Sequence, residues 1–341
     1  MSEKKNELKE IEVEYSEADK GLLNVKGIGP KTLEKLKEAN ITTIEQLAVL
    51  RGEELSDILQ ITKKAAKDIV NDAKSQALDK AIILGTFNDV IKHRKEIVQR
   101  IPTGSSNFDK IMKGGIPTEA ITVFKGEFAS GKTQMCDQLA VNCIKYLKRK
   151  VAWIETETGC FVPERFQEIA KAIGLEINGD KDFIYSGSQN ITTPYALLLA
   201  IQRIEMQIQK DNLDIGLLVI DSFTAPFRSF YHGREMLPDR ASEISRHLGY
   251  LDQLAKKYNM AIVLTSQVMD IPDPGAQLGE RVKSGHTKRM WGGNVLSHGG
   301  TYLISLQQVA GVQWEGIIFD APDIPRSSFR FKIISAGVRD V

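Results

Sequence analysis

The sequence predicts an α/β protein with a largely parallel sheet, preceded by a small all-α domain. From about residue 97 onward, apolar runs of strand length alternate with helical segments. Strands buried on both faces read as continuous apolar runs, so this alternation is typical of a parallel sheet covered by helices on both sides. Ahead of it, through residues 16–79, apolar positions recur at helical spacing.

The amino-terminal part divides into three segments. Residues 1–15 alternate Glu and Lys with few apolar positions, which is typical of a disordered, solvated tail. Residues 16–79 form the expected helical domain, in which Gly27 and Gly29 separate two helical patterns. Residues 80–96 are the expected linker. Their apolar stretch is either a short docked strand or helix, or an anchor for a neighbouring subunit.

Residues 97–341 form the expected α/β core. Its first strands are expected at 120–124, 151–154, 217–220 and 261–264. The helices between them are expected at 133–147, 163–173, 195–210 and 240–257. The last third of the chain adds expected strands at 301–306, 316–319 and 329–334.

Composition limits the functional class. The 341 residues are enough for two domains, and 42% apolar with 26% charged residues is an ordinary soluble composition. The net charge is only +1, so a nucleic-acid surface would have to come from local clustering. Three cysteines without metal-ligand spacing favour a reducing compartment. Since neither a secretory signal nor an apolar run of about 18 residues is found, we expect a cytoplasmic protein without membrane contact.

Residues 126–133 match a phosphate-binding loop in full. They read GEFASGKT, the pattern GxxxxGK[ST], after an apolar strand and at the start of a helix. Glycines allow a tight turn whose backbone N–H groups face phosphate oxygens, and the helix directs its positive end at the same anion. ATP and Mg²⁺ are therefore the expected ligands, with Lys132 on the β- and γ-phosphates and the Thr133 hydroxyl on the metal. The residues expected to contact nucleotide here are Gly126, Glu127, Phe128, Ala129, Ser130, Gly131, Lys132, Thr133 and Gln134.

Polar side chains at the ends of three other strands complete the expected site. Asp221 ends the run 217–220 and is expected to hold the Mg²⁺ shell, although an Asp that caps the next turn is the alternative. Glu155 and Glu157 follow the strand 151–154, and either carboxylate is a candidate base for activating water. Gln267 follows the strand expected at 261–264, where its side-chain amide could donate a hydrogen bond to the terminal phosphate. The alternative, which is favoured if this residue is considered alone, is that its side chain only forms hydrogen bonds within a loop.

Eight segments together resemble the archaeal RadA family of DNA recombinases, which is related to the eukaryotic strand-exchange recombinases and to the bacterial RecA core. The segments are GEFASGKTQ (126–134), WIETET (153–158), PERF (163–166), LLVIDS (217–222), FRSFYHGR (227–234), TSQV (265–268), GGNVLSH (292–298) and DAPDIP (320–325). This resemblance implies a RecA-like P-loop ATPase core and a helix-hairpin-helix domain at 16–79. It also implies ATP-dependent strand exchange on single-stranded DNA filaments in recombinational repair.

The resemblance assigns roles at the nucleotide site. Glu157 matches the carboxylate that activates water, Gln267 the glutamine that links the γ-phosphate to a DNA loop, and Arg165 an arginine that stacks on adenine. Residues 320–325, which include Asp320 and Pro322, match a segment that caps ATP from the neighbouring protomer. Whether a K⁺ ion joins this cap is left open, with Asp320 as the candidate ligand.

Two DNA-binding loops are also implied. The first contains or flanks Arg228, Arg234 and Arg240, and the second spans 269–291 and ends in Gly292 and Gly293. The basic residues expected to contact DNA in the second loop are Arg281, Lys283, Lys288 and Arg289. A flexible basic loop can follow a phosphate backbone, although a solvated surface loop is the alternative. Duplex DNA is the expected partner of the turn at 25–31, where a plain packing hairpin is the alternative.

Self-association into filaments or rings is implied by residues at the subunit boundary. Phe87 matches a phenylalanine that inserts into the next subunit, and His298 matches a histidine near the same boundary. The chain departs from the family pattern at Val90, where Ala is usual, at Ala129, where Gly is usual, and at Glu155, where Asp is usual. Residues 307–313 contain no Lys or Arg, whereas the family has a basic hairpin there.

These departures keep a second interpretation open. A non-catalytic mediator or paralogue would bind ATP and a partner recombinase through Phe87 without exchanging strands. Recombination mediators are also candidate partners if the chain is itself the recombinase. A third interpretation, a RecA-type ATPase such as a circadian or helicase module, leaves the helix-hairpin-helix domain and the segments 163–166 and 320–325 unexplained.

Overall fold

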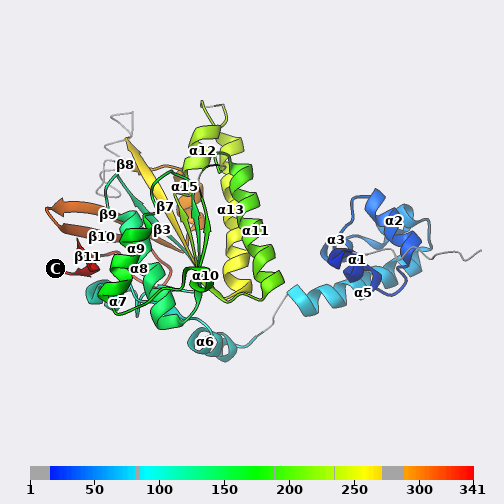
Figure 1. The fold of residues 1–341 in the computed structure, drawn as a ribbon. Helices are drawn as coiled ribbons and strands as arrows, with labels where there is room; N and C mark the ends of the chain where they lie inside the picture. The colour runs from blue at the N-terminus through cyan, green and yellow to red at the C-terminus, as the bar shows by residue number, and fades with distance from the viewer. Residues whose placement is uncertain (1–15, 82–84, 188, 190, 234, 271–287) are drawn as a thin grey trace, which may run out of the picture. The chain divides into compact units, whose positions relative to one another are not determined.

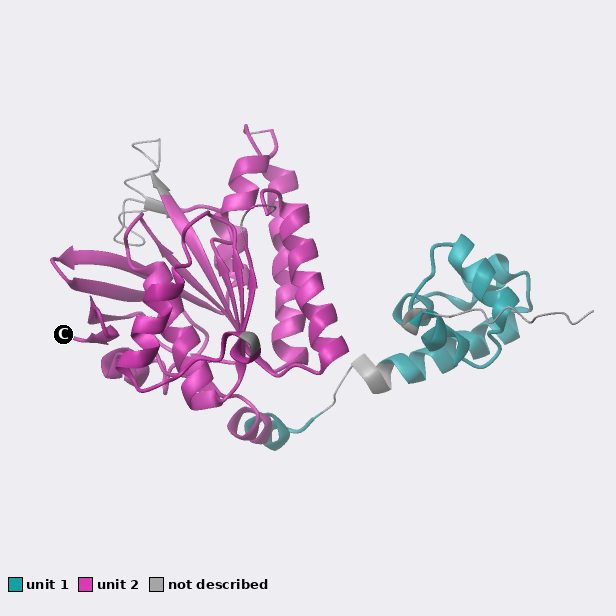
Figure 2. Cartoon of the chain, in the orientation of Figure 1, with its two compact units in different colours: residues 1–91 teal, residues 92–341 magenta. Residues whose placement is uncertain are grey.

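Two compact units make up the chain (Figure 2). The computed structural model describes residues 16–81, 85–187, 189, 191–233, 235–270 and 288–341. The first unit comprises residues 1–91 and the second residues 92–341. The expected tail at 1–15 lies outside the described residues.

The first unit is built from five helices among its described residues, before the helix at 87–96. They are α1 (Glu17–Leu23), α2 (Pro30–Glu38), α3 (Ile44–Ala48), α4 (Gly52–Leu59) and α5 (Lys63–Ala81). Ser16 and Thr43 cap α1 and α3, since each hydroxyl accepts a hydrogen bond from the backbone N–H three residues later. Gly27 adopts φ 90°, and a Cβ there would lie 3.1 Å from Ile69 Cγ1, so this turn requires glycine.

Helix α6 (Phe87–Glu96) follows residues 82–84, which lie outside the described residues. The predicted alternatives for the apolar stretch were a docked strand or helix and an anchor. The structure places its last residue, Phe87, at the start of α6 with 79% of its surface exposed, and Val90 is exposed on the same helix. Phe87 is therefore mostly exposed, and its role as an anchor for a neighbouring subunit stays a prediction.

One large sheet organises the second unit (Figure 1). Its parallel part pairs β5 (Phe183–Ser186), β4 (Lys150–Glu155), β6 (Ile215–Asp221), β7 (Ala261–Asp270), β3 (Ala120–Gly126) and β9 (Tyr302–Ala310), in that order. Antiparallel strands continue it from β9 through β10 (Gln313–Asp320), β11 (Ser327–Ile334) and β12 (Gly337–Asp340). A short strand, β8 (Lys288–Met290), pairs with the end of β7. The predicted, largely parallel sheet is confirmed.

Helices cover both faces of this sheet, as the apolar runs predict. On one face, α8 (Lys132–Asn142) and α9 (Pro163–Ala172) pack in one core cluster with Val151 and Trp153. On the other face, α11 (Pro194–Asp211) and α13 (Leu237–Lys257) pack with Ala152 and Ile154 (Figure 1). Successive β4 side chains thus enter opposite cores, which is why the strand is apolar at each position from Val151 to Ile154.

Several short helices and strands were not predicted from the sequence, because a periodic pattern can be recognised only over more residues than they contain. They are β1 (Arg100–Ile101), α7 (Ser106–Ile111), β2 (Ile116–Pro117), α10 (Gly179–Asp182), β5, α12 (Ala225–Phe230), α15 (Gly293–Gly299) and β12. The helix predicted at 133–147 is α-helical only to Asn142, and the π-helical turn Cys143–Leu147 completes it. Among the described residues, no helix is long and apolar enough to cross a bilayer.

A buried arginine ties the sheet together at the end opposite the phosphate loop. Arg149, directly before β4, is 8% exposed and donates hydrogen bonds to Asp214 Oδ1, Gln99 Oε1 and the carbonyls of Ile215, Tyr258 and Asn259. These partners belong to the start of β6, the end of α13 and the segment before β1. Since the guanidinium is saturated by protein atoms, it is structural.

We predict that Arg149→Met lowers the free energy of unfolding by about 3 kcal/mol, because it leaves buried carbonyls without donors. Denaturant unfolding checks this. Arg246→Met is the matched control, since Arg246 is exposed and pairs only loosely with Glu243 at 3.5 Å; its effect should stay within about 0.5 kcal/mol. Equal effects of the two substitutions would contradict the structural role of Arg149.

Candidate nucleotide site

The phosphate-loop sequence forms a tight turn between β3 and α8. Gly131 adopts φ 87° and is the residue before α8, and a Cβ on it would lie 2.8 Å from Ile333 Cδ1. A Cβ on Gly126 would collide with Ser130 and with the backbone of Leu306. Ala129, where the sequence departs from the usual glycine, adopts φ 60°. The loop therefore keeps the left-handed conformation at a position where a side chain makes it less favourable.

Lys132 is directed back over the loop. Its Nζ donates to the carbonyls of Gly126 at 3.1 Å and Glu127 at 2.7 Å, and to Ser130 Oγ at 3.2 Å. Burial lowers the pKa of the Lys132 ammonium, while the nearby Asp221 acts in the opposite direction. An ammonium held at the mouth of a turn of backbone amides is suited to a polyphosphate, as predicted.

Asp221, the last residue of β6, connects the start of α8 to the neighbouring strand β7. Thr133 Oγ1 donates to Asp221 Oδ2 at 2.6 Å, and Thr265 Oγ1 donates to Asp221 Oδ1 at 2.5 Å. The carboxyl is 2% exposed, and burial raises its pKa even though both hydroxyl bonds lower it. The alternative of a simple turn cap does not fit, because one carboxylate oxygen bonds α8 and the other bonds β7 rather than the following turn.

The donor set fits Mg²⁺ bound together with nucleotide. In the parts of the chain that the structure describes, no group of three or more His, Cys, Asp or Glu is arranged to hold a metal ion by itself. Mg²⁺ commonly takes one or two protein oxygens and completes its shell with phosphate oxygens and water. Thr133 and Asp221, 2.6 Å apart at the loop, supply such a pair.

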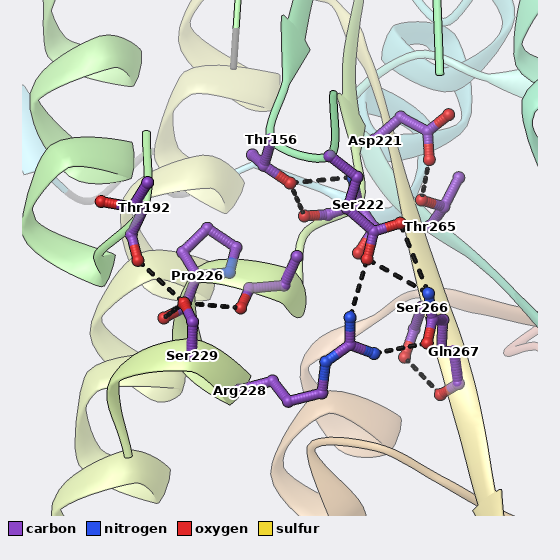
Figure 3. Close-up of polar contacts among 12 residues, drawn as sticks. Thr156, Thr192, Asp221, Ser222, Pro226, Arg228, Ser229, Thr265, Ser266 and Gln267 are labelled. Carbon is purple, nitrogen blue, oxygen red and sulfur yellow. Dashed lines mark hydrogen bonds and ion pairs between the residues drawn. The ribbon is translucent and has the colours of Figure 1, made fainter. Parts of the chain in front are cut away.

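Figure 3 shows Arg228 and Gln267 of a three-residue network whose third member, Glu157, lines the same cavity as Thr133 and Asp221. Glu157 Oε1 accepts hydrogen bonds from Arg228 at 2.9 Å and from Gln267 Nε2 at 3.1 Å. Arg228 also donates to Gln267 Oε1. Thr156 holds the preceding backbone in place, because its Oγ1 donates to the Ser222 carbonyl at 2.6 Å and accepts from the Ser222 N–H at 3.0 Å. The predicted water-activating carboxylate and the predicted phosphate-sensing amide are therefore in direct contact.

The structure distinguishes between the two candidate bases, Glu155 and Glu157. Glu155 is 4% exposed and its carboxylate accepts hydrogen bonds from the backbone of Cys160 and Phe161 and from the Tyr185 hydroxyl. That carboxylate holds the loop after β4 and has no remaining role in activating water. Glu157 is partly exposed and lines the same cavity as Lys132, so the geometry favours Glu157.

The nucleotide cavity has a volume of about 400 Å³ and extends beyond the loop. Trp314 from β10 and Ile333 from β11 line it together with Lys132, Glu157 and Asp221. The sequence did not predict Trp314 and Ile333 as site residues, because the sequence of a strand does not show which loop its side chains will contact. At the far side, Arg165 donates to Gln134 Oε1 at 2.8 Å and to the carbonyls of Ile334 and Ser335.

Gln267 also reaches the base of the predicted second DNA loop. The Trp291 backbone N–H donates to the Gln267 carbonyl at 3.0 Å, and Ser266 Oγ donates to the Trp291 carbonyl at 3.2 Å. The Trp291 ring is buried, and the Arg240 guanidinium lies 4.6 Å from its centroid. Trp291 thus anchors the loop end, and Arg240, predicted to contact DNA, packs on this anchor.

Two family models match the chain. The one described as Rad51 matches residues 93–341, and the one described as a SAM-like helix-hairpin-helix tandem matches residues 19–75. The chain belongs to the Rad51 family. Its RecA-like α/β core and its helix-hairpin-helix domain agree with the fold class predicted from the sequence.

Rad51-family relatives align over nearly the whole chain. A protein named DNA repair and recombination protein RadA from Aeropyrum pernix is 34% identical, over 100% of this chain and 99% of its own length. A protein of the same name from Ignicoccus hospitalis is 35% identical, over 92% of this chain and 94% of its own length. The predicted resemblance to the RadA recombinases is confirmed.

Other residues predicted from the Rad51-type pattern lie away from the nucleotide cavity. Asp320 and Pro322 are exposed at the end of β10, and neither lines the cavity at the phosphate loop of the same chain. His298 is exposed in the last turn of α15, and Gly292 and Gly293, both with positive φ, begin that helix. The backbones of Lys288 and Arg289 form β8, but their side chains are not among the described ones. Arg234, Arg281 and Lys283 lie outside the described residues.

A buried carboxyl on α8 generates a prediction for pH dependence. Asp137 is 2% exposed, and among the described residues its Oδ1 has no hydrogen-bond partner. Its Oδ2 accepts from Gln134 Nε2 at 3.4 Å. Burial raises the pKa of Asp137 well above its usual value, and the negative Asp221 adds to the rise.

We predict that Asp137→Asn raises the free energy of unfolding by about 1–3 kcal/mol near pH 7.5. Because the pKa is raised in the folded state, the unfolded chain releases this proton first as pH rises from about 4. The wild type therefore loses stability relative to the variant over that range, and the difference should shrink toward pH 4. Thermal unfolding at several pH values measures it, with the exposed Asp252→Asn as the control. A difference independent of pH would contradict the raised pKa.

Proposed function

We propose that the chain is an ATP-dependent DNA recombinase that forms filaments on single-stranded DNA and catalyses homologous pairing and strand exchange. The observation that carries the proposal is Gln267. Its amide contacts the candidate catalytic Glu157, and its backbone carbonyl holds the base of the predicted DNA loop through Trp291. A simple ATPase has no need for this link, whereas a recombinase must relate nucleotide state to DNA contact.

The nucleotide would be held mainly by the loop at 126–133. Its backbone amides and Lys132 would bind the β- and γ-phosphates, and Thr133 with Asp221 would hold Mg²⁺. When bound, this ion supplies positive charge that neutralises charge developing on the phosphate oxygens. Arg165 is proposed to stack on adenine, in keeping with its place between Gln134 and the 334–335 carbonyls. Asp320 and Pro322 are proposed to cap ATP from the neighbouring protomer, with K⁺ as a candidate ion.

Hydrolysis would be a direct displacement by water. The water oxygen bonds to the γ-phosphorus while the bond to the bridging oxygen breaks, and Glu157 accepts the water proton. Gln267 would orient the terminal phosphate and register its loss. Loss of that contact would then be transmitted along β7 to the second DNA loop and loosen the filament.

DNA would be bound by three surfaces. The loops at 228–240 and 269–293 would hold the single strand through its phosphates, so sequence would be read by base pairing rather than by the protein. The proposed residues are Arg228, Arg234, Arg240, Arg281, Lys283, Lys288, Arg289, Gly292 and Gly293. The helix-hairpin-helix domain would hold duplex DNA. Phe87, Val90 and His298 are proposed to form the contact between protomers.

We predict that Lys132→Ala abolishes both DNA-dependent ATP hydrolysis and strand exchange, because the loop loses its phosphate-binding cation. Both are measured with single-stranded circles and homologous linear duplex. Lys210→Ala, at an exposed position of α11, serves as the control and should retain both activities. Activity of Lys132→Ala equal to wild type would refute the site assignment.

We predict that Glu157→Gln lowers kcat for ATP by about 100-fold or more while ATP still binds, because the amide cannot accept the proton. Filaments should still form and should persist longer, as seen by electron microscopy with ATP and single strands. If neither the wild type nor this variant forms filaments, a mediator that binds ATP and a partner recombinase becomes the better interpretation.

A further inference from the structure

One guanidinium is bonded to both side chains proposed for hydrolysis. Arg228 donates to Glu157 Oε1 at 2.9 Å through one terminal nitrogen and to Gln267 Oε1 through the other (Figure 3). Gln267 Nε2 donates to the same carboxylate. In this arrangement Glu157 Oε1 already accepts two hydrogen bonds, and the Gln267 carbonyl oxygen is occupied.

The Glu157 carboxylate is occupied by its hydrogen-bond partners Arg228 and Gln267. General-base catalysis requires a free lone pair, because the carboxylate must take a proton from the attacking water. The hydrogen bonds to Oε1 occupy lone pairs that the water would need. The arrangement therefore restrains hydrolysis rather than promoting it.

The Arg228 side chain is placed so that it can leave. Its backbone is fixed in α12, because the neighbouring Phe227 is fully buried and Ser229 Oγ donates to the Thr192 carbonyl at 2.9 Å. The Arg228 side chain itself is 41% exposed. A long, half-exposed side chain on a fixed backbone can exchange partners without a change in the fold.

We infer that Arg228 is a positioning residue that restrains Glu157 and Gln267 until a DNA phosphate takes its guanidinium. Arginine binds phosphate through two parallel hydrogen bonds, so a backbone phosphate can replace the two side-chain partners it has here. Release then frees the carboxylate to accept the water proton and the amide to bond the terminal phosphate. The inference rests on the proposed function and explains how DNA would switch on hydrolysis at that site.

The test measures ATP hydrolysis by the full chain with and without single-stranded DNA. Arg228→Gln should raise the rate without DNA by about three- to tenfold, as expected for loss of a charge-assisted contact, and should reduce the DNA stimulation ratio toward one. Arg228→Lys keeps the charge but not the two-pronged geometry, so its rate without DNA should lie between those of wild type and Arg228→Gln. Arg203→Gln, an exposed arginine on α11, is the matched control and should behave as wild type.

A second substitution tests whether Arg228 acts through Glu157. Arg228→Gln combined with Glu157→Gln should hydrolyse ATP no faster than Glu157→Gln alone, whereas an effect of Arg228 that does not pass through Glu157 would still raise the rate above that of Glu157→Gln. A rate without DNA that is equal to or below wild type in Arg228→Gln, with an unchanged melting temperature, would overturn the inference. If Arg228→Gln does not fold, Arg228→Lys carries the same criterion. A wild type without DNA-stimulated hydrolysis would instead refute the proposed function, so the two failures are distinguishable.

Discussion

The parallel pairing of β3, β4, β6 and β7 is the constraint on which the rest of the site depends. Parallel neighbours run toward the same edge of a sheet, so residues at or near the carboxyl ends of these four strands meet there. They are the phosphate loop after β3, Glu157 after β4, Asp221 at the end of β6 and Gln267 within β7. Asp221 holds these segments together, because its two carboxylate oxygens accept hydrogen bonds from hydroxyls on two different elements, Thr133 of α8 and Thr265 of β7. The hydrogen bond from Thr133 directs this buried carboxyl toward the phosphate loop.

The antiparallel extension of the sheet supports the same loop from outside. Trp314 and Ile333 of β10 and β11 lie against Gly131, where even a methyl group would not fit. The buried Gln138 of α8 accepts hydrogen bonds from the Val338 N–H and from Arg339 near the end of the chain. Together these contacts hold α8 between the parallel strands and the carboxyl-terminal strands. The phosphate loop is thus held on two sides by other parts of the chain.

Strand β7 connects the candidate nucleotide site with the end of the second predicted DNA loop. Along β7, Thr265 bonds Asp221, Gln267 bonds Glu157, and the Gln267 carbonyl bonds Trp291 at the far end of the second loop. Arg228 approaches the same point from α12, which follows β6. Arg228, from the first predicted DNA loop, and Trp291, at the end of the second, therefore both bond Gln267.

The sequence alone determined where most helices and strands lie and which functional residues belong to a local motif. The loop at 126–133, the strand carrying Asp221 and the alternation of strands and helices are visible because periodicity and motif spacing act over short distances. The sequence could not choose between Glu155 and Glu157, because the choice depends on Tyr185 and on the backbone at 160–161, which fold back onto Glu155. It also could not pair Glu157 with Arg228 and Gln267, which lie 71 and 110 residues away. Tertiary structure decided these contacts, because strand order in the sheet brings together side chains that no local pattern relates.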